Sequence, residues 1–225
     1  LALADPSHPD ASPLPEACEE AQLIGKLFPE KAVYCGVDAT EEMLQAGSAT
    51  AQHLLLSTHG KFNAHNPMFS YLVLTPTEES DGKLHTYEVF GLPLRADLVV
   101  MSACETFLVH FKEMERQVRA VRGTGEDEPV ELSAELLETL TAGDEIVGLT
   151  RAFISAGTPS VMSTLWEVVS GPTRELMVAF YGFLGTGLDL AEALRQAQLA
   201  LLKDDSGLYH HPLYWAAFVP YGDWR

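Results

Sequence analysis

Apolar residues follow two patterns along the chain: short continuous runs, and longer stretches in which they recur every three or four positions. Three runs are strongly apolar, at residues 52–60, 96–104 and 159–166. Runs of this kind favour strands that are covered on both faces of a sheet. Shorter strands are predicted from weaker patterns at residues 31–36, 71–75, 83–90 and 214–222.

Stretches with helical spacing lie between these runs. They predict helices at residues 14–28, 38–47, 144–157, 172–187 and 189–203. Capping residues support several of these helices, because Asp144 and Asp189 precede apolar stretches and Pro172 opens one. For the second helix, either Asp38 or Thr40 fits the cap. Strands that alternate with helices indicate an α/β fold with a mostly parallel central sheet flanked by helices.

The two ends of the apolar pattern suggest the domain limits. Residues 1–13 are rich in Pro, Ala and Asp, and we expect them to be a linker or a tail from an upstream domain. Residues 14–225 have the length of a single domain. A charged insert interrupts the pattern at about residues 107–143.

Net charge narrows the function classes. The chain carries a formal charge of −18, which argues against nucleic-acid binding, since that binding needs Lys and Arg to displace counterions. The charge leaves open either attraction of a basic partner or a role in solubility alone. No apolar stretch approaches the roughly 20 residues that span a bilayer, so no membrane segment is expected.

The three cysteines, Cys18, Cys35 and Cys104, include no CxxC pair. This odd number argues against a disulfide framework and against a zinc site, and it suits a reducing cytoplasm. We expect Cys18 and Cys35 to be buried thiols. No histidine spacing matches a metal template, so neither a metal nor another cofactor is expected.

Two of the apolar runs end in reactive side chains: STHG brings His59 and SAC brings Cys104. If these strands are parallel neighbours, both side chains lie at the same edge of the sheet, where ligands bind in such folds. A cysteine nucleophile needs a nearby base and backbone N–H donors for the oxyanion. The N–H groups of Gly60 and Cys104 are candidate donors. Taken singly, His59 also fits a structural hydrogen-bonding role, and Cys104 fits a small core residue.

Several blocks resemble, in order, those of a CHAT domain: LLLSTHGKFNAHNPMFSYLVLT, LRADLVVMSACET, DEIVGLTRAFISAGTPSVMSTLWEV, and LAEALRQAQLALL with HPLYWAAFVPYG. CHAT domains are caspase-like peptidase domains that often follow tetratricopeptide repeats in bacterial proteins. The resemblance covers about residues 14–221. It implies a caspase-like three-layer sandwich, with His59 as the catalytic histidine and Cys104 as the nucleophile.

The resemblance also implies a function. It points to a regulated, cytoplasmic cysteine endopeptidase that acts on a specific protein or peptide partner in bacterial signalling or defence, controlled by an upstream regulatory or repeat domain. A catalytically silent binding or scaffold module is the alternative. A weaker option is an acyltransferase or transpeptidase that uses the same thioester. The sequence does not determine the substrate or the oligomeric state.

The chain departs from the family pattern in two places. The insert at residues 107–143 contains Arg116, Arg119 and Arg122, and it is open to interpretation as a self-cleavage site, a lid, a docking arm or a solvated hairpin. After STLWE the usual acidic residues are absent apart from Glu167. We expect Trp166 and Glu167 to bind the substrate residue before the scissile bond, although Glu167 is equally suited to pair with a local arginine.

Overall fold

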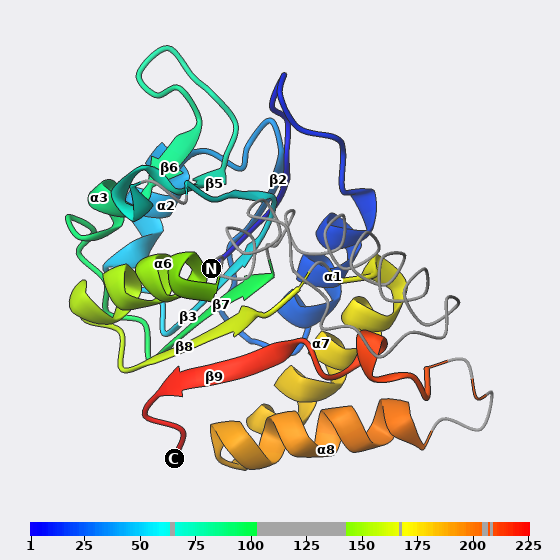
Figure 1. Ribbon diagram of the computed structural model, residues 1–225. Coiled ribbons are helices and arrows are strands. Elements are labelled where there is room, and N and C mark those ends of the chain that lie inside the picture. The colour runs from blue at the N-terminus through cyan, green and yellow to red at the C-terminus, as the bar shows by residue number, and fades with distance from the viewer. Residues whose placement is uncertain (64–65, 103–142, 167, 204–206, 208) are drawn as a thin grey trace, which may run out of the picture.

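The computed structural model describes residues 1–63, 66–102, 143–166, 168–203, 207 and 209–225. Within them, a six-stranded sheet forms the centre of the molecule (Figure 1). Its strands, in spatial order, are β2 (Val33–Gly36), β1 (Ala2–Pro6), β3 (His53–Ser57), β7 (Leu98–Ser102), β8 (Ser160–Thr164) and β9 (Phe218–Gly222). All neighbouring pairs are parallel except β8 and β9, which are antiparallel.

A small antiparallel sheet follows β3 in the chain. It consists of β4 (Gly60–Lys61), β5 (Tyr71–Val73) and β6 (Lys83–His85), with the short turn η1 (Pro67–Phe69) between β4 and β5. A second such turn, η2 (Pro212–Tyr214), precedes β9. The first strand of the small sheet begins directly after His59, one of the predicted site residues.

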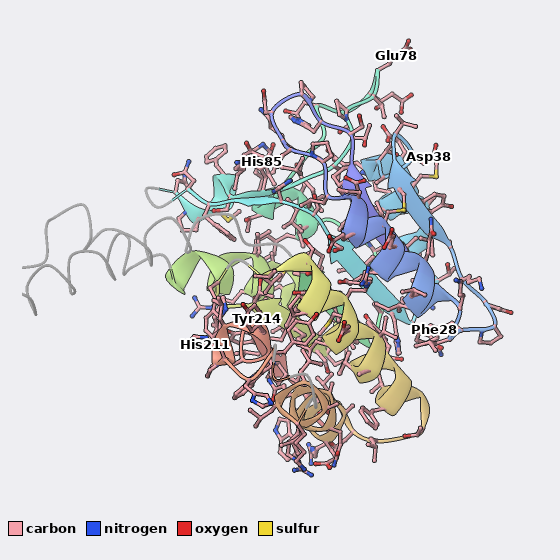
Figure 2. The ribbon with its side chains drawn as sticks, turned by 90° about the vertical axis from the view of Figure 1, so that its right-hand side faces the viewer. Phe28, Asp38, Glu78, His85, His211 and Tyr214 are labelled. Carbon is pink, nitrogen blue, oxygen red and sulfur yellow. A yellow bond between two sulfur atoms is a disulfide. The ribbon has the colours of Figure 1, made fainter. Side chains whose placement is uncertain are left out.

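Helices cover both faces of the large sheet (Figure 1). One face packs against α1 (Pro15–Gly25), α7 (Ser170–Gly185) and α8 (Leu190–Leu202), and Figure 2 shows α1 and α7 side by side there. The other face packs against α2 (Glu41–Ser48), α3 (Thr86–Val89) and α6 (Gly143–Ser155). Successive side chains of β3 alternate between the two cores, since Leu55 faces α1 while Leu54 and Leu56 face away from it. The predicted α/β class is confirmed.

Two capping predictions are confirmed, whereas the cap predicted at Asp144 is wrong, because α6 already begins at Gly143. The Thr40 side chain accepts a hydrogen bond from the Met43 N–H, so Thr40 rather than Asp38 caps α2. Asp189 caps α8 in the same way. The strand predicted at residues 83–90 is wrong after His85, because the Glu88 carboxylate accepts the His85 N–H at 2.8 Å and starts α3.

The expectation of a linker over residues 1–13 is wrong for its first part. Residues 2–6 form β1, which pairs with β2 on one side and with β3 on the other. Ala2, Leu3 and Ala4 are buried in the two cores. The linker-like composition therefore describes only the connection between β1 and α1. The predicted insert at 107–143 lies, apart from Gly143, outside the described residues.

The cysteine interpretation is also corrected. Cys18 in α1 and Cys35 in β2 form a disulfide, with their Cα atoms 5.7 Å apart. The two residues are 17 positions apart in sequence, and only the packing of α1 against the edge of the sheet brings them together. Since two of the three cysteines form a disulfide, the cysteines no longer favour a reducing cytoplasm. Among the helices that the structure describes, none is long and apolar enough to cross a bilayer.

Candidate active site

The ends of β3 and β7 lie at the same level of the sheet. The two strands are parallel neighbours, and Ser57 stands opposite Ser102. The pairing continues by one residue, because the Thr58 N–H donates to the Ser102 carbonyl at 3.3 Å. His59 follows Ser57 by two positions, and in the sequence Cys104 follows Ser102 by two positions. Cys104 itself, like Glu167, lies outside the described residues.

The backbone of His59 is held between the two sheets. Its carbonyl accepts the Val73 N–H of β5 at 2.8 Å. The Thr58 hydroxyl donates to the Val73 carbonyl at 2.5 Å. His59 is only 9% exposed. A histidine fixed in this way keeps one position at the carboxyl edge of the sheet, as a group that must meet a reacting atom requires.

The imidazole of His59 is oriented by a backbone carbonyl. Its Nε2 lies 2.8 Å from the carbonyl oxygen of Ser12, and the Ser12 hydroxyl is 3.5 Å away. A carbonyl oxygen can only accept a hydrogen bond, so Nε2 carries the proton of this contact. In the neutral ring Nδ1 is then the basic nitrogen. This contact has the same form as the hydrogen bond by which a third group orients the base in catalytic triads.

The loop that carries Ser12 is anchored at both ends. At its start, Asp5 adopts φ 48°, a left-handed conformation that Asp tolerates better than most residues. The Asp5 carboxylate reaches across the loop and accepts the Leu14 N–H at 2.5 Å. The Ser7 N–H donates to the Thr75 hydroxyl at 2.9 Å. Asp5 and Ser12 were missed in the sequence because this stretch has the composition of a linker.

Gly60 begins β4 and stands opposite Leu72 of β5. In an antiparallel ladder the N–H groups of consecutive residues point to opposite sides. The His59 carbonyl is bonded to β5, so the Gly60 N–H points away from β5. The predicted role of this N–H in holding an oxyanion remains a prediction.

A pocket of about 110 Å³ adjoins His59. Among the described residues, its walls come from the start of α1, the ends of β3 and β7 and the start of α7, and they include Glu16, Glu20, Ser57, His59, Ser102 and Thr173. This volume is comparable with the roughly 150 Å³ cavity that holds a benzene-sized ligand, so the pocket accommodates a single side chain.

Glu20 is the most unusual residue of the pocket. It is 2% exposed, and its Oε1 has no hydrogen-bond partner in the described part of the chain. Burial raises the pKa of the Glu20 carboxyl to about 8, and the Arg174 charge opposes this only in part. A visible signal for Glu20 exists in the sequence, because it lies on the same helical face as Ala17, Ala21 and Ile24.

Trp166 is placed apart from this pocket. Its indole N–H donates to the Leu213 carbonyl at 3.2 Å, and its ring packs against the core on the α7 and α8 side. Trp166 is not among the described residues that line the pocket. Its predicted contact with substrate therefore stays a prediction. In the part of the chain that the structure describes, no group of three or more His, Cys, Asp or Glu residues is placed to hold a metal.

Comparison with known proteins identifies relatives of the chain. A family model described as CHAT domain matches residues 1–223. Tetratricopeptide repeat protein 28 of Homo sapiens is 28% identical over an alignment of 229 positions, which covers 93% of this chain and 8% of that protein. The protein of the same name from Mus musculus is 28% identical over an alignment of 227 positions, which covers 93% of this chain and 9% of that protein. The chain thus spans less than a tenth of the length of either relative.

Proposed function

Because this chain belongs to the CHAT domain family, whose fold is related to caspase-like peptidases, we propose that it is a cysteine endopeptidase in which His59 and Cys104 form the catalytic dyad. One observation carries the proposal. His59 is fixed and oriented at the carboxyl end of β3, level with the end of β7, and the chain that leaves β7 reaches Cys104 after two residues. The adjoining pocket supplies a place for a substrate side chain.

The proposed reaction begins with proton transfer from the Cys104 thiol to Nδ1 of His59. The thiolate attacks the carbonyl carbon of a peptide bond, and the oxyanion is held by the N–H groups of Gly60 and Cys104. The imidazolium, stabilised by the Ser12 carbonyl on Nε2, protonates the leaving amine as the C–N bond breaks. Water, deprotonated by His59, then hydrolyses the thioester and frees the acid and the thiol.

The proposed substrate is a protein or peptide, and the proposed control comes from a repeat module upstream. The names of both relatives support the second part, since each is a tetratricopeptide repeat protein. The family resemblance suggested bacterial defence and a cytoplasmic location, whereas these two relatives are mammalian. The proposal is therefore regulated cleavage of a protein partner, and it includes neither a particular organism nor a cellular location.

A digest of a peptide library tests the proposal. The full chain with its upstream region is compared with its Cys104→Ala variant and with a Cys18→Ser/Cys35→Ser variant, which removes the two disulfide-bonded cysteines. We expect the wild type and the double variant to cut the same peptides and Cys104→Ala to cut none. Identical cleavage by all three proteins, or cleavage by none, would contradict a Cys104 peptidase. The second outcome would favour a binding module.

A further inference from the structure

The pocket beside His59 contains two carboxyl groups on one helix. Glu16 is exposed in the first turn of α1, and Glu20 is one turn further along and buried. Residues four positions apart lie on the same face of a helix, so both carboxyls face the pocket from α1. The pocket is therefore acidic at its rim and at its buried wall.

A buried carboxyl without a partner is costly for a fold. Most buried charged groups are paired, and among the described residues the charge of Arg174 in α7 acts on Glu20. However, Arg174 donates through Nη1 to Glu19 at 2.9 Å, on the outer side of α1. The Oε1 atom of Glu20 has no hydrogen-bond partner among the described residues. A buried Glu20 carboxyl without a partner lowers the stability of the fold, and such a group is typical of a site whose ligand provides the missing partner.

We propose that this pocket binds the cationic side chain of a lysine or arginine next to the scissile bond, and that Glu20 determines this specificity; the assignment of a scissile bond rests on the proposed peptidase function. The ammonium or guanidinium group would take the place of the missing partner of Oε1. An arginine fork can bond both carboxylate oxygens at once. The chain's net charge of −18 favours the approach of a cationic substrate.

An acidic side chain is the alternative occupant. The first turns of α1 and α7 both border the pocket, and helix N-termini favour anions. Glu16 opposes an anion directly, with no Lys or Arg in the described lining to offset it, and the Glu20 carboxyl gains its negative charge only when a cation is present to stabilise it. A cation meets no such repulsion.

Cation binding has a proton signature. The groups around Glu20 are Arg174 and Tyr181 of α7, His59 after β3, and Glu16 of its own helix. In the empty pocket burial keeps the Glu20 carboxyl largely protonated at pH 7. A bound cation favours the ionised form, so the carboxyl releases its proton to solvent on binding. Affinity for the cation should therefore rise with pH between about 6 and 8.

The first experiment measures binding without turnover. In the full chain carrying Cys104→Ala, calorimetry at pH 7 is performed with N-acetyl-arginine amide, N-acetyl-norleucine amide and N-acetyl-glutamate amide. We expect the arginine probe to bind at least tenfold more tightly than the other two, with proton release that is visible as a dependence on buffer ionisation heat. Glu20→Gln should remove both the preference and the proton release. Glu30→Gln, which removes the same charge from an exposed position beyond the end of α1, should keep them.

The second experiment measures cleavage of peptides that differ only in the residue before the scissile bond. We expect kcat/KM to be at least tenfold higher for arginine or lysine than for norleucine in the wild type, and equal in Glu20→Gln. A peptidase that prefers neutral or acidic residues would overturn the inference while the proposed function stands. If arginine binds in a Glu20-dependent way but no peptide is cleaved, the proposed peptidase function is wrong and the proposed cation pocket stands. If Glu20→Gln does not fold, the ranking of the three probes in the Cys104→Ala chain decides.

Discussion

Strand β3 carries one histidine at its first residue and another two residues past its end, and the two have opposite surroundings. His53 lies at the amino edge of the sheet, with its ring against Phe28 and Tyr181 at centroid distances of 5.3 and 6.0 Å. Its Nδ1 has no hydrogen-bond partner among the described residues. His59 lies at the carboxyl edge, where the Ser12 carbonyl orients its ring. In Figure 2 Phe28 marks the amino edge, and Asp38, just after β2, marks the carboxyl edge.

This difference shows that surroundings, rather than residue type, decide the role of a histidine. Burial against aromatic rings lowers the pKa of His53, which is half-buried and lines a pocket of about 600 Å³ together with Phe28 and Tyr181. His59 has a polar partner that fixes its tautomer and lies in the wall of a pocket. The carboxyl edge also contains the strained Asp5 and the buried Glu20. Groups that cost stability at one edge of the sheet are typical of a functional site.

The largest expected effect separates the two histidines by activity. His59→Ala should lower kcat/KM by about 10³-fold, equivalent to about 4 kcal/mol, because the general base and acid is lost. His53→Ala should leave kcat/KM within about threefold of the wild type at temperatures where both proteins are folded, since His53 is far from the reacting groups. Initial rates on one peptide substrate measure both. An equal loss in the two variants would remove the functional difference between the edges.

The pH dependence of stability gives the next effect. The pKa of Glu20 is raised by burial to about 8, so the folded chain binds a proton that the unfolded chain has lost above about pH 4.5. Stability contributed by this proton is present in acid and lost as pH rises towards 8. The free energy of unfolding of Glu20→Gln, minus that of the wild type, should therefore increase by about 3 kcal/mol from pH 5 to pH 8.

Urea unfolding at the two pH values measures this difference. The cost of burying the glutamine amide cancels, because it is present at both pH values. Glu30→Gln, at an exposed position, serves as the control, and its difference from the wild type should change little between the two pH values. A constant difference between Glu20→Gln and the wild type would mean that Glu20 is ionised in the folded chain, paired with a group that the described contacts do not include.

Removal of the disulfide measures how much the link between α1 and β2 contributes to stability. Cys18 and Cys35 close a loop of 17 positions that ties α1 to β2. Their joint replacement by serine should lower the free energy of unfolding by about 3 kcal/mol, as expected for a loop of this length. Urea unfolding with and without a reducing agent provides the measurement. The reductant should lower the stability of the wild type and leave the double variant unchanged. An equal response of both proteins would mean that the disulfide does not form in solution.

The sequence predicted the parts of the fold that depend on local pattern. The apolar runs of β3, β7 and β8 were identified because strands buried on both faces need apolar residues at every position. The cap Asp189 was identified, and the cap of α2 was narrowed to Asp38 or Thr40, because capping depends on residues three positions apart. The position of His59 followed from the same reasoning, since parallel neighbours end at one edge.

The missed features all depend on contacts between distant segments. β1 has a weak local pattern, and it is a strand because β2 and β3 flank it. The Cys18–Cys35 disulfide depends on how a helix packs on a strand. The Ser12 carbonyl is invisible in a sequence, because every residue has a backbone carbonyl. Glu20 was visible as a charge on an apolar helix face, but the pocket beside it requires three-dimensional packing to be recognised.

Asp5 offers a smaller test of the same edge. Asp5→Ala loses the acceptor for the Leu14 N–H and places alanine at φ 48°, which together should cost about 2 kcal/mol of stability. The Ser12 carbonyl would then be held less firmly against His59, so kcat should fall about tenfold. Asp5→Asn keeps an amide oxygen and tolerates this conformation, and it should restore both values. Thermal unfolding and kcat are measured together. Loss of stability with unchanged kcat would mean that the loop does not position His59.

The smallest effect returns to the amino edge, where the pH dependence should have the opposite sign to that of Glu20. Burial lowers the pKa of His53, so the unfolded chain gains a proton below about pH 6.5 that the folded chain resists. Stability is then lost as pH falls, by at most about 1.4 kcal/mol per pH unit. His53→Phe keeps an aromatic ring beside Phe28 and Tyr181 and has no such proton.

The difference in unfolding free energy between His53→Phe and the wild type should therefore increase from pH 7 to pH 5, whereas that of Glu20→Gln increases from pH 5 to pH 8. Urea unfolding of the three proteins in one set of buffers measures both trends. A His53 difference that is constant below pH 7 would show that the ring accepts a proton in the folded chain. Since a charged ring at the amino edge needs a polar partner, the contrast between the two histidines would then lie in their position at the sheet and not in their polarity.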